Sequence, residues 1–219
     1  QRSSAWADVA RRIAHEIKNP LTPIQLSAER LRRKYQKEIT SDPTVFEQCT
    51  NTIIRQVGDI GRMVDEFSSF ARMPKALLES ADISATVKEA LVLQKASTEE
   101  LDFIIELPEE PVVLAFDRRL VTQAVTNLVK NAREALEPRL QDDPAHKGRI
   151  RVRLTRDDKQ VHIAVADNGI GLPQENRGRL TEPYMTTREK GTGLGLAIVK
   201  RIMAEHNGEI NFDDAPNDF

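Results

Sequence analysis

The 219-residue sequence is poor in cysteine, in long apolar runs and in charge of one sign, and each shortage excludes a class of protein. Its single cysteine, Cys49, cannot form a disulfide within the chain and fits a reducing compartment; we interpret it as a small buried residue on a helix seam. No apolar run approaches the roughly 20 residues that a membrane span needs, and the start lacks a signal-peptide pattern. Because the chain begins at Gln1 rather than methionine, we expect it to be a fragment.

The charge is small but unevenly distributed. The net charge is −2, yet residues 1–75 contain 13 Lys+Arg and 9 Asp+Glu, a balance of +4, whereas residues 76–219 contain 19 and 25, a balance of −6. This asymmetry indicates two units with different partners, and it is too mild to indicate nucleic-acid binding. One basic cluster is either a solvated helix end or a docking patch for an acidic partner; its members are Arg30, Arg32, Arg33, Lys34 and Lys37.

Two stretches with helical periodicity open the chain. Apolar residues recur every three or four positions from Trp6 to Tyr35 and again from Val45 to Ala71, with turn and cap residues at 40–43 between them. This pattern predicts a helical hairpin. Because each helix has one apolar stripe and little core of its own, we expect two hairpins to pair into a four-helix bundle, which makes the protein a homodimer. The predicted seam residues are Trp6, Val9, Ile13, Ile17, Leu21, Ile24, Ala28, Leu31, Tyr35, Val45, Cys49, Ile53, Val57, Ile60, Val64, Phe67 and Ala71.

The pattern changes after the hairpin. We assign residues 1–73 to the hairpin, 74–82 to a linker and 83–219 to a second domain. Mixed helices and strands in this second part predict an α+β domain, in which a strand-like EINF near the end belongs to a final strand that is cut short. The predicted elements are helices from Ile83, over 118–137 and over about 194–206, and strands over FIIEL, VVLAF, RIRVRLTR and QVHIAVAD, the last two paired.

Two glycine-containing motifs of the second domain are typical of ligand sites. GTGLGL, residues 191–196, precedes an apolar helical run, so its glycines permit a tight turn and the helix N-terminus attracts phosphate. DNGIG follows a strand, and the Asp167 carboxylate there is able to accept a hydrogen bond from an exocyclic amine such as that of adenine, with Gly169 and Gly171 admitting the base. The alternatives are a helix-entry turn and an Asp-Asn-Gly turn.

A third motif lies on the helix predicted between these strands. Gln123, Asn127 and Asn131 are spaced by four residues and therefore share one helix face. Asparagine is a poor helix former, and amide oxygens suit a Mg²⁺ ion that also holds phosphate oxygens. The alternative is a solvated polar stripe, but three such motifs in one α+β domain favour a nucleotide site.

A fourth motif, AHEIKNPL, lies in the first helix. His15 and Glu16 begin like the His-Glu-x-x-His of zinc proteases, but the fifth position is Asn19, so the second histidine ligand is missing. His15 lies two residues beyond the seam position Ile13 and should point out of the bundle, as a reacting group must. Pro20 predicts either a simple bend or a hinge just after these residues.

The order of these motifs resembles the sensor histidine kinases. Asn127–Asn131, Asp167–Gly171, TEPYMTT at 181–187 and GTGLGL resemble their ATP-binding domain, and HEIKNPL resembles their phosphoacceptor box. Residues 5–35 and the DAP near the end resemble, within the family, the nitrogen-regulation sensors. The resemblance implies a fold class: an α-helical hairpin, a four-helix bundle as a dimer, followed by an α+β ATP-binding domain of the gyrase/Hsp90/histidine-kinase (Bergerat) type.

The resemblance also implies roles. His15 would accept the γ-phosphoryl group of ATP, Glu16 would act as general base, and Asn19 would orient water for dephosphorylating a partner response regulator. Asn131 would bind Mg²⁺. The implied nucleotide-binding residues are Asn127, Asn131, Asp167, Gly169, Gly171, Thr186, Thr187, Gly191, Thr192, Gly193, Leu194 and Gly195.

The same resemblance implies a mobile lid over residues 172–190, in which Arg188 and Lys190 either contact phosphate or are merely solvated. It further implies that these residues are the cytoplasmic portion of a membrane-anchored bacterial sensor. The expected partners are a second copy of the chain and a cognate response regulator, without nucleic-acid or membrane contact by these residues.

Three departures from the family pattern bear on activity. Thr181 and Tyr184 replace the two usual phenylalanines of the lid motif, and Glu134 stands where a lysine that contacts phosphate is usual. The lead hypothesis is an ATP-dependent histidine kinase. The alternatives are a protein that acts mainly as a regulator phosphatase, which Asn19 and Glu134 favour, and a dimeric scaffold that binds nucleotide without turnover.

Overall fold

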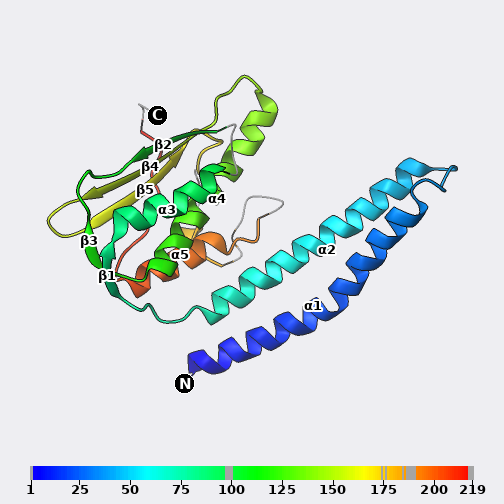
Figure 1. Cartoon of the computed structure of the whole chain (residues 1–219), viewed down its shortest axis with the longest axis horizontal. Helices are drawn as coiled ribbons and strands as arrows, with labels where there is room; N and C mark the ends of the chain where they lie inside the picture. The colour runs from blue at the N-terminus through cyan, green and yellow to red at the C-terminus, as the bar shows by residue number, and fades with distance from the viewer. Residues whose placement is uncertain are drawn as a thin grey trace. The chain divides into compact units, whose positions relative to one another are not determined.

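The computed structural model describes residues 2–96, 101–173, 175, 177–183, 185 and 191–216. The chain divides into two compact units. One comprises Gln1–Pro74 and Thr187–Leu194, and the other comprises Lys75–Thr186 and Gly195–Phe219. Figure 1 labels their helices and strands. Within the described part of the chain, every helix is too short or too polar to span a lipid bilayer.

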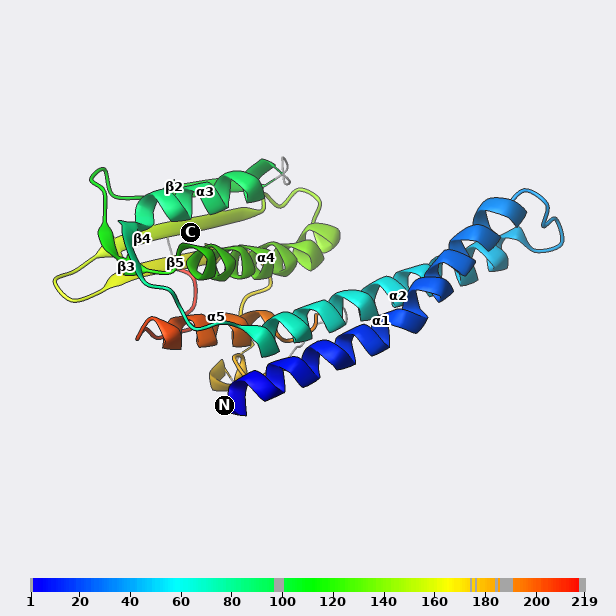
Figure 2. The same cartoon turned by 60° about the horizontal axis from the view of Figure 1, so that its bottom comes forward.

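The first unit is a helical hairpin of α1, Arg2–Tyr35, and α2, Pro43–Arg72. The two helices run side by side in Figures 1 and 2. The Asp42 side chain caps α2 by accepting a hydrogen bond from the backbone N–H of Val45 at 3.1 Å, and Pro43 occupies the first turn, where no helical N–H bond is lost. The hairpin predicted from the sequence is confirmed.

Each helix of the hairpin has two apolar faces rather than the single stripe that the sequence predicted. Small and β-branched residues are buried where α1 packs on α2; among them are Ala10, Ala14, Ala28, Thr50, Val57 and Val64. Larger aliphatic residues are each about half exposed, and they form what we call the outer stripe: Val9, Ile13, Ile17, Ile24, Leu31, Val45, Ile53, Ile60 and Met63. The predicted seam therefore mixes residues of both faces, because the two faces lie close together around each helix.

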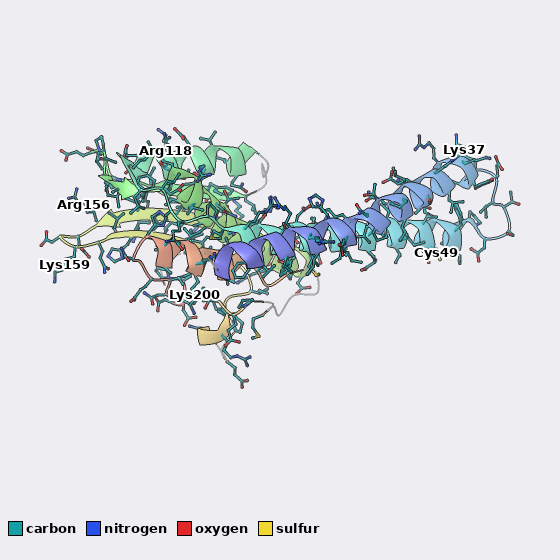
Figure 3. All side chains as sticks on the ribbon, turned by 90° about the horizontal axis from the view of Figure 1, so that it is seen from below. Lys37, Cys49, Arg118, Arg156, Lys159 and Lys200 are labelled. Atoms are coloured by element: carbon teal, nitrogen blue, oxygen red, sulfur yellow. The ribbon has the colours of Figure 1, made fainter. Side chains whose placement is uncertain are left out.

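Two further predictions concern single residues of the hairpin. Cys49 is exposed, near Lys37 toward the end of the hairpin in Figure 3, so its interpretation as a buried seam residue was wrong. The helix α1 continues through both Pro20 and Pro23, and Figure 1 shows that it bends along its length. The helix is therefore bent, as Pro20 predicted, and it is not broken at either proline.

The second unit combines two small sheets with helices. Strand β1 pairs with β3 in antiparallel orientation, and the other sheet has the order β2-β4-β5, in which β2 and β4 are parallel and β4 and β5 antiparallel. The predicted α+β architecture is confirmed. The described elements are β1 Glu79–Asp82, α3 Ile83–Ala96, β2 Asp102–Glu106, β3 Val113–Phe116, α4 Arg118–Asp142, β4 Arg149–Arg156, β5 Val161–Asp167, the short 3-10 helix η1 Arg177–Arg179 and α5 Gly195–Glu205.

Two predicted boundaries and one predicted strand of this unit were wrong. Residues 79–82, assigned to the linker, form β1, whose pairing with β3 could not be read from so short a segment. The helix α4 continues past Glu137, because Pro138 removes only its own N–H bond and Asp143 N–H still donates to the Arg139 carbonyl at 2.9 Å. The predicted EINF strand is absent: residues 209–212, all described, have no strand assignment.

One helix organises the core of the second unit. The helix α4 contacts α3, α5 and the strands β4 and β5, as Figure 2 shows. Its apolar face and the strand β4 contribute more than half of the buried residues of the core cluster, including Val125, Leu136, Ile150 and Val152. The opposite, polar face of α4 is thereby held on a rigid base.

Candidate functional site

The phosphoacceptor motif lies on the exposed side of α1. His15 is exposed and directly follows Ala14, which is buried against α2, so the prediction that His15 points out of the hairpin is confirmed. Asn19, also exposed, lies one turn further along the same face. The two side chains are therefore accessible to a second protein surface or to a bound nucleotide.

The Glu16 carboxylate lies on the same exposed turns. Its Oε1 accepts a hydrogen bond from Nε of Arg12, one turn earlier, at 3.2 Å, and both side chains are well exposed. Such an exposed pair is weak and exchanges readily with other partners. Glu16 is thus not locked into a buried ion pair.

The two prolines of α1 alter the backbone at this motif. In an α-helix the N–H of residues 20 and 23 would donate to the carbonyls of Glu16 and Asn19, and proline has no N–H. The carbonyl oxygens of both motif residues therefore lack their usual helical donors. Below them, the Lys18 ammonium pairs with the Asp65 carboxylate of α2 and ties this turn of α1 to the second helix.

On the second unit, the polar face of α4 meets the start of α5. The Asn127 side-chain amide donates to the carbonyl of Gly195 at 3.3 Å. Asn131 lies one turn further, and a methyl group added at Gly195 would lie 3.8 Å from its Oδ1. Both asparagines are half-buried. The structure thus brings together two amides and a helix N-terminus, the kind of surface that attracts phosphate.

The Asp167–Gly171 loop begins at the end of β5 and packs on α4. Its Gly169 N–H donates to the Asp167 carboxylate at 3.0 Å, and its Ile170 N–H donates to the Ala135 carbonyl of α4 at 3.0 Å. A Cβ at Gly169 would lie 2.4 Å from that same carbonyl oxygen, which no real structure tolerates. Glycine at 169 is therefore required by the close approach of α4, a reason different from the admission of a base that the sequence suggested.

Gly171 differs from Gly169. It has φ +77°, a left-handed conformation that favours glycine, and a Cβ there would meet open space. Gly193, which lies just before α5, has φ +68°, and the N–H of Leu194 donates to the Thr192 hydroxyl at 3.3 Å. These two glycines fit the conformational role that their motifs predicted.

Gly191 is also described, whereas Thr186 and Thr187, together with Tyr184, Arg188 and Lys190, lie outside the described residues.

Three further residues, to which the sequence analysis assigned no role, hold the loop by hydrogen bonds. Arg139 NH1 donates to the Gly169 carbonyl at 3.0 Å, and His146 Nε2 lies 3.1 Å from the Asn168 carbonyl. The Asn168 side chain accepts from Arg149 N–H at 2.7 Å and donates to the Lys147 carbonyl at 2.9 Å. Only Asn168 lay inside a recognised motif.

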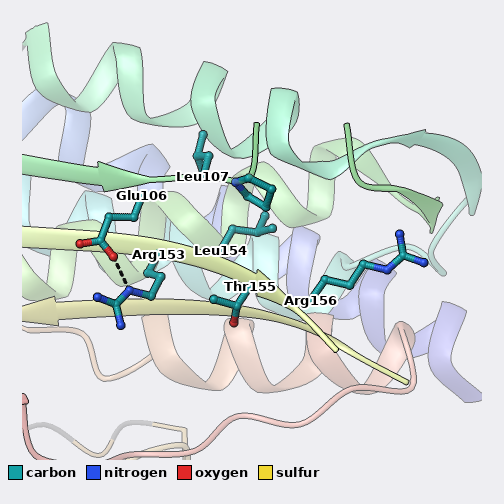
Figure 4. A pocket seen from close by; sticks show the side chains of 7 residues that line it. Glu106, Leu107, Arg153, Leu154, Thr155 and Arg156 are labelled. Carbon is teal, nitrogen blue, oxygen red and sulfur yellow. Dashed lines mark hydrogen bonds and ion pairs between the residues drawn. The ribbon is translucent and has the colours of Figure 1, made fainter. Parts of the chain in front are cut away.

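Two hollows lie in the second unit. One, of about 460 Å³, is lined by Arg139, His146, Asp167, Asn168, Gly169, Gly171, Ala215 and Pro216, and so includes the residues predicted for the adenine end of the site. The other, of about 420 Å³, lies where β2 and β4 end and is shown in Figure 4, with Arg153 paired to Glu106. It contains none of the predicted site residues.

Two protein-family models match the chain. The model of the His Kinase A (phospho-acceptor) domain matches residues 5–75, and the model of the histidine kinase-, DNA gyrase B- and HSP90-like ATPase matches residues 116–218. The chain belongs to the sensor histidine kinases. Its second unit is accordingly the ATP-binding domain of such a kinase, and the predicted fold class is confirmed.

Relatives place the chain more finely among these kinases. It is 61% identical over 217 residues to the nitrogen regulation protein NtrY of Azorhizobium caulinodans, covering 99% of this chain and 28% of that protein. It is 39% identical over 211 residues to a putative NtrY-like sensor histidine kinase of Rickettsia bellii, covering 96% and 33%. The chain thus spans about a third of the length of these relatives. The likeness to nitrogen-regulation sensors is confirmed.

A solved structure shows the same fold. The crystal structure of the histidine kinase ThkA in complex with the response regulator protein TrrA matches with a TM-score of 0.61 at 24% identity, covering 94% of this chain and 57% of that one. At this identity the likeness concerns the fold alone.

The donor set of this chain fits Mg²⁺-ATP. Asn131 offers a hard amide oxygen beside the N-terminus of α5, and the Asp167 carboxylate lies at the other end of the site. The unusual Glu134 lies one turn past Lys130 on α4, with Oε1 of Glu134 3.9 Å from the Lys130 ammonium. Lys130 therefore offsets part of the negative charge of Glu134.

Proposed function

We propose that this chain is the catalytic core of an ATP-dependent protein histidine kinase that phosphorylates His15 and passes the phosphoryl group to an aspartate of a response regulator. Residues 1–73 would form the dimerisation and phosphotransfer hairpin, and the catalytic domain would begin at β1 and continue to residue 219. The observation that carries the proposal is the exposed His15, held on a rigid helix between Ala14 on the buried face and Asn19 one turn on.

The first chemical step is a displacement at phosphorus. A lone pair of the distal imidazole nitrogen of His15 forms a bond to the γ-phosphorus, the bond from that phosphorus to the β–γ bridging oxygen breaks, and ADP leaves with the electron pair. The imidazole then carries a proton on its other nitrogen that becomes more acidic. Glu16, held on the same exposed turns by only a weak pair with Arg12, takes that proton as general base.

The proposed catalytic domain binds and orients the nucleotide. Asp167 accepts a hydrogen bond from the adenine amine, Gly171 and the 191–195 segment supply backbone that approaches the ligand closely, and Asn127 fixes the start of α5 through the Gly195 carbonyl. Asn131 is the residue that would hold Mg²⁺, which neutralises phosphate charge when bound. Thr186 and Thr187 complete the set as lid residues.

The outer stripe supports a homodimer. Nine aliphatic side chains along one side of two long helices would otherwise remain in water, and pairing with a second hairpin buries them in a four-helix bundle. The match to the phospho-acceptor domain family and the likeness to NtrY support a response regulator of the NtrX-like type as the second partner. In this proposal the chain is the cytoplasmic portion of a membrane-anchored bacterial sensor.

The test is incubation with γ-³²P-ATP and Mg²⁺, with the wild type beside His15→Gln. We expect acid-labile, alkali-stable label on the wild type and none on the variant, because phosphohistidine hydrolyses in acid and survives base. Label that persists in His15→Gln would overturn the assignment of the nucleophile. Absence of label from the wild type, with ATP still bound, would overturn the kinase proposal.

A phosphatase activity toward the same regulator is the second candidate. Asn19 is exposed on the face of His15, one turn away, where its amide can hold a water molecule against a regulator docked on α1. Asn19→Ala should slow dephosphorylation of the regulator while leaving labelling of His15 nearly unchanged. Full phosphatase activity in Asn19→Ala would refute this role.

A further inference from the structure

The helix α4 contacts both ends of the proposed nucleotide site. Its middle carries Asn127 and Asn131 at the phosphate end, and its last turn carries Arg139, whose guanidinium donates to the Gly169 carbonyl at 3.0 Å. Eight residues separate Asn131 from Arg139, roughly 12 Å along a helix axis. One rigid element therefore spans the distance between the metal end and the adenine end.

The position of the Asp167 carboxylate depends on the loop that follows it. That carboxylate accepts a hydrogen bond from the Gly169 N–H at 3.0 Å. A shift of the Gly169 peptide therefore moves the carboxylate that is proposed to bind the adenine amine. The other side of the same loop is fixed by Ile170 N–H to the Ala135 carbonyl at 3.0 Å. The loop is short and contains two glycines, so its conformation is set by these external bonds more than by local preference.

Several further hydrogen bonds fix the Asp167–Gly171 loop. Arg139 binds the Gly169 carbonyl, His146 Nε2 lies 3.1 Å from the Asn168 carbonyl, and the Asn168 amide bridges two backbone groups of the 147–149 segment. Because a carbonyl only accepts, His146 donates through Nε2–H in either its neutral or its charged form. We call Arg139 and His146 the loop clamp; both line the 460 Å³ cavity.

We propose that the loop clamp, Arg139 with His146, is a pair of positioning residues that sets the affinity for the adenine end of ATP by holding the Asp167–Gly171 loop. The identity of the nucleotide in this proposal rests on the proposed function. The clamp itself rests only on the hydrogen-bond geometry. The residues act through the loop and do not touch the transferred phosphoryl group. They should therefore change nucleotide binding and leave the transfer of phosphoryl from His15 to the regulator unchanged.

The first measurement is the Kd of a fluorescent adenine nucleotide for the whole chain carrying Arg139→Gln, His146→Ala or both. We expect each single change to raise Kd roughly three- to tenfold, and the pair more, the scale of a lost hydrogen bond to a loop. Arg139→Lys keeps one donor and should restore part of the affinity. Transfer from phosphorylated His15 should keep its wild-type rate.

Matched controls exist for both changes. Arg118→Gln alters the same residue type at the other end of α4, where Arg118 pairs with Glu89, as Figure 3 helps to locate. His162→Ala alters an exposed histidine whose partner is Asp157. Both controls should leave Kd within error. A Kd in the clamp variants equal to that of the controls would overturn the proposal.

The second measurement separates the clamp from the proposed function. Amide hydrogen exchange of Ile170 and Gly169, followed by NMR on nucleotide-free protein, should accelerate in Arg139→Gln and not in Arg118→Gln, with an unchanged melting temperature. Unchanged exchange would refute the clamp whatever the ligand. Faster exchange in a wild-type-like fold that binds no adenine nucleotide would instead refute the proposed function and retain the clamp.

Discussion

The two units of the chain differ in where their apolar side chains lie. In the second unit they form one contiguous core around α4, with Leu136, Ile150 and Val152 fully buried. In the hairpin, small residues are buried between the helices and the larger aliphatic residues of the outer stripe remain about half exposed. A unit with its own core can be stable alone, whereas the hairpin depends on what covers the outer stripe. The predictions below test that difference, from the largest expected effect to the smallest.

Truncation of the central core residue should have the largest effect. Leu136 has no exposed surface, so Leu136→Ala should lower the free energy of unfolding of the second unit by about 2–5 kcal/mol through lost burial and a residual cavity. Urea denaturation followed by circular dichroism measures it. The loss should be the same at all protein concentrations, and a concentration-dependent loss would contradict the idea of a self-sufficient core.

Addition of a methyl group at the loop should come next. Gly169→Ala places a Cβ 2.4 Å from the Ala135 carbonyl, so α4 or the loop must move, at a cost of about 1–3 kcal/mol. Gly178→Ala is the matched control, because a Cβ there meets nothing within 4 Å. Equal melting temperatures for the two variants, measured by calorimetry, would show that the loop does not press on the helix.

Truncation in the outer stripe should behave differently from truncation in the core. Ile53 is 42% exposed, so Ile53→Ala should cost roughly 1 kcal/mol or more in a paired hairpin and little in a single one. Its effect on thermal unfolding should therefore shrink as the protein is diluted below the dimer dissociation constant. Thr52→Ala, on the exposed surface next to it, serves as control. An Ile53→Ala effect that is independent of concentration would contradict pairing through this stripe.

The smallest predicted effect is a pH dependence of the second unit at Asp117. Burial of this N-cap residue of α4 would raise its pKa, but hydrogen bonds from the N–H groups of Leu77 and Leu120, together with the Arg119 guanidinium, outweigh burial and lower the pKa. A lowered pKa in the folded state adds stability above the unfolded pKa, and this stability is lost as pH falls through the folded pKa.

Asp117→Asn keeps a good N-cap and removes the titrating group. The variant should be less stable than the wild type at neutral pH, and the two should converge as pH falls through the lowered pKa of the Asp117 carboxylate. Urea midpoints measured from pH 7 to pH 2 check this, with exposed Asp158→Asn as control. A constant gap between wild type and Asp117→Asn over this range would refute the assignment.

Much of the site could be predicted because its signals are local. The spacing of Asn127 and Asn131 placed both on one helix face, and the placement of His15 beyond Ile13 indicated exposure; both hold in the structure. Arg139 could not be found in this way. Its role requires α4 to continue past Pro138 and a partner 30 residues away, at Gly169, and neither follows from local sequence.

The errors in the fold have similar physical causes. Periodicity alone could not separate the inner face of the hairpin from the outer stripe, since Val57 and Ile53 are both apolar and lie at neighbouring helix angles. The strand β1 is four residues long and is defined by its partner β3 rather than by its own pattern. Pairing between distant segments decides such elements, so a single sequence under-determines them.

The contact between Gly169 and Ala135 changes how the Asp-x-Gly motif is to be interpreted in other sequences. The first glycine is demanded by the backbone of a helix, so it records how the chain folds. A related domain that no longer binds nucleotides would still need the glycine. Searches for functional ATPases in this fold should therefore give weight to the aspartate, and treat the glycine as evidence of ancestry.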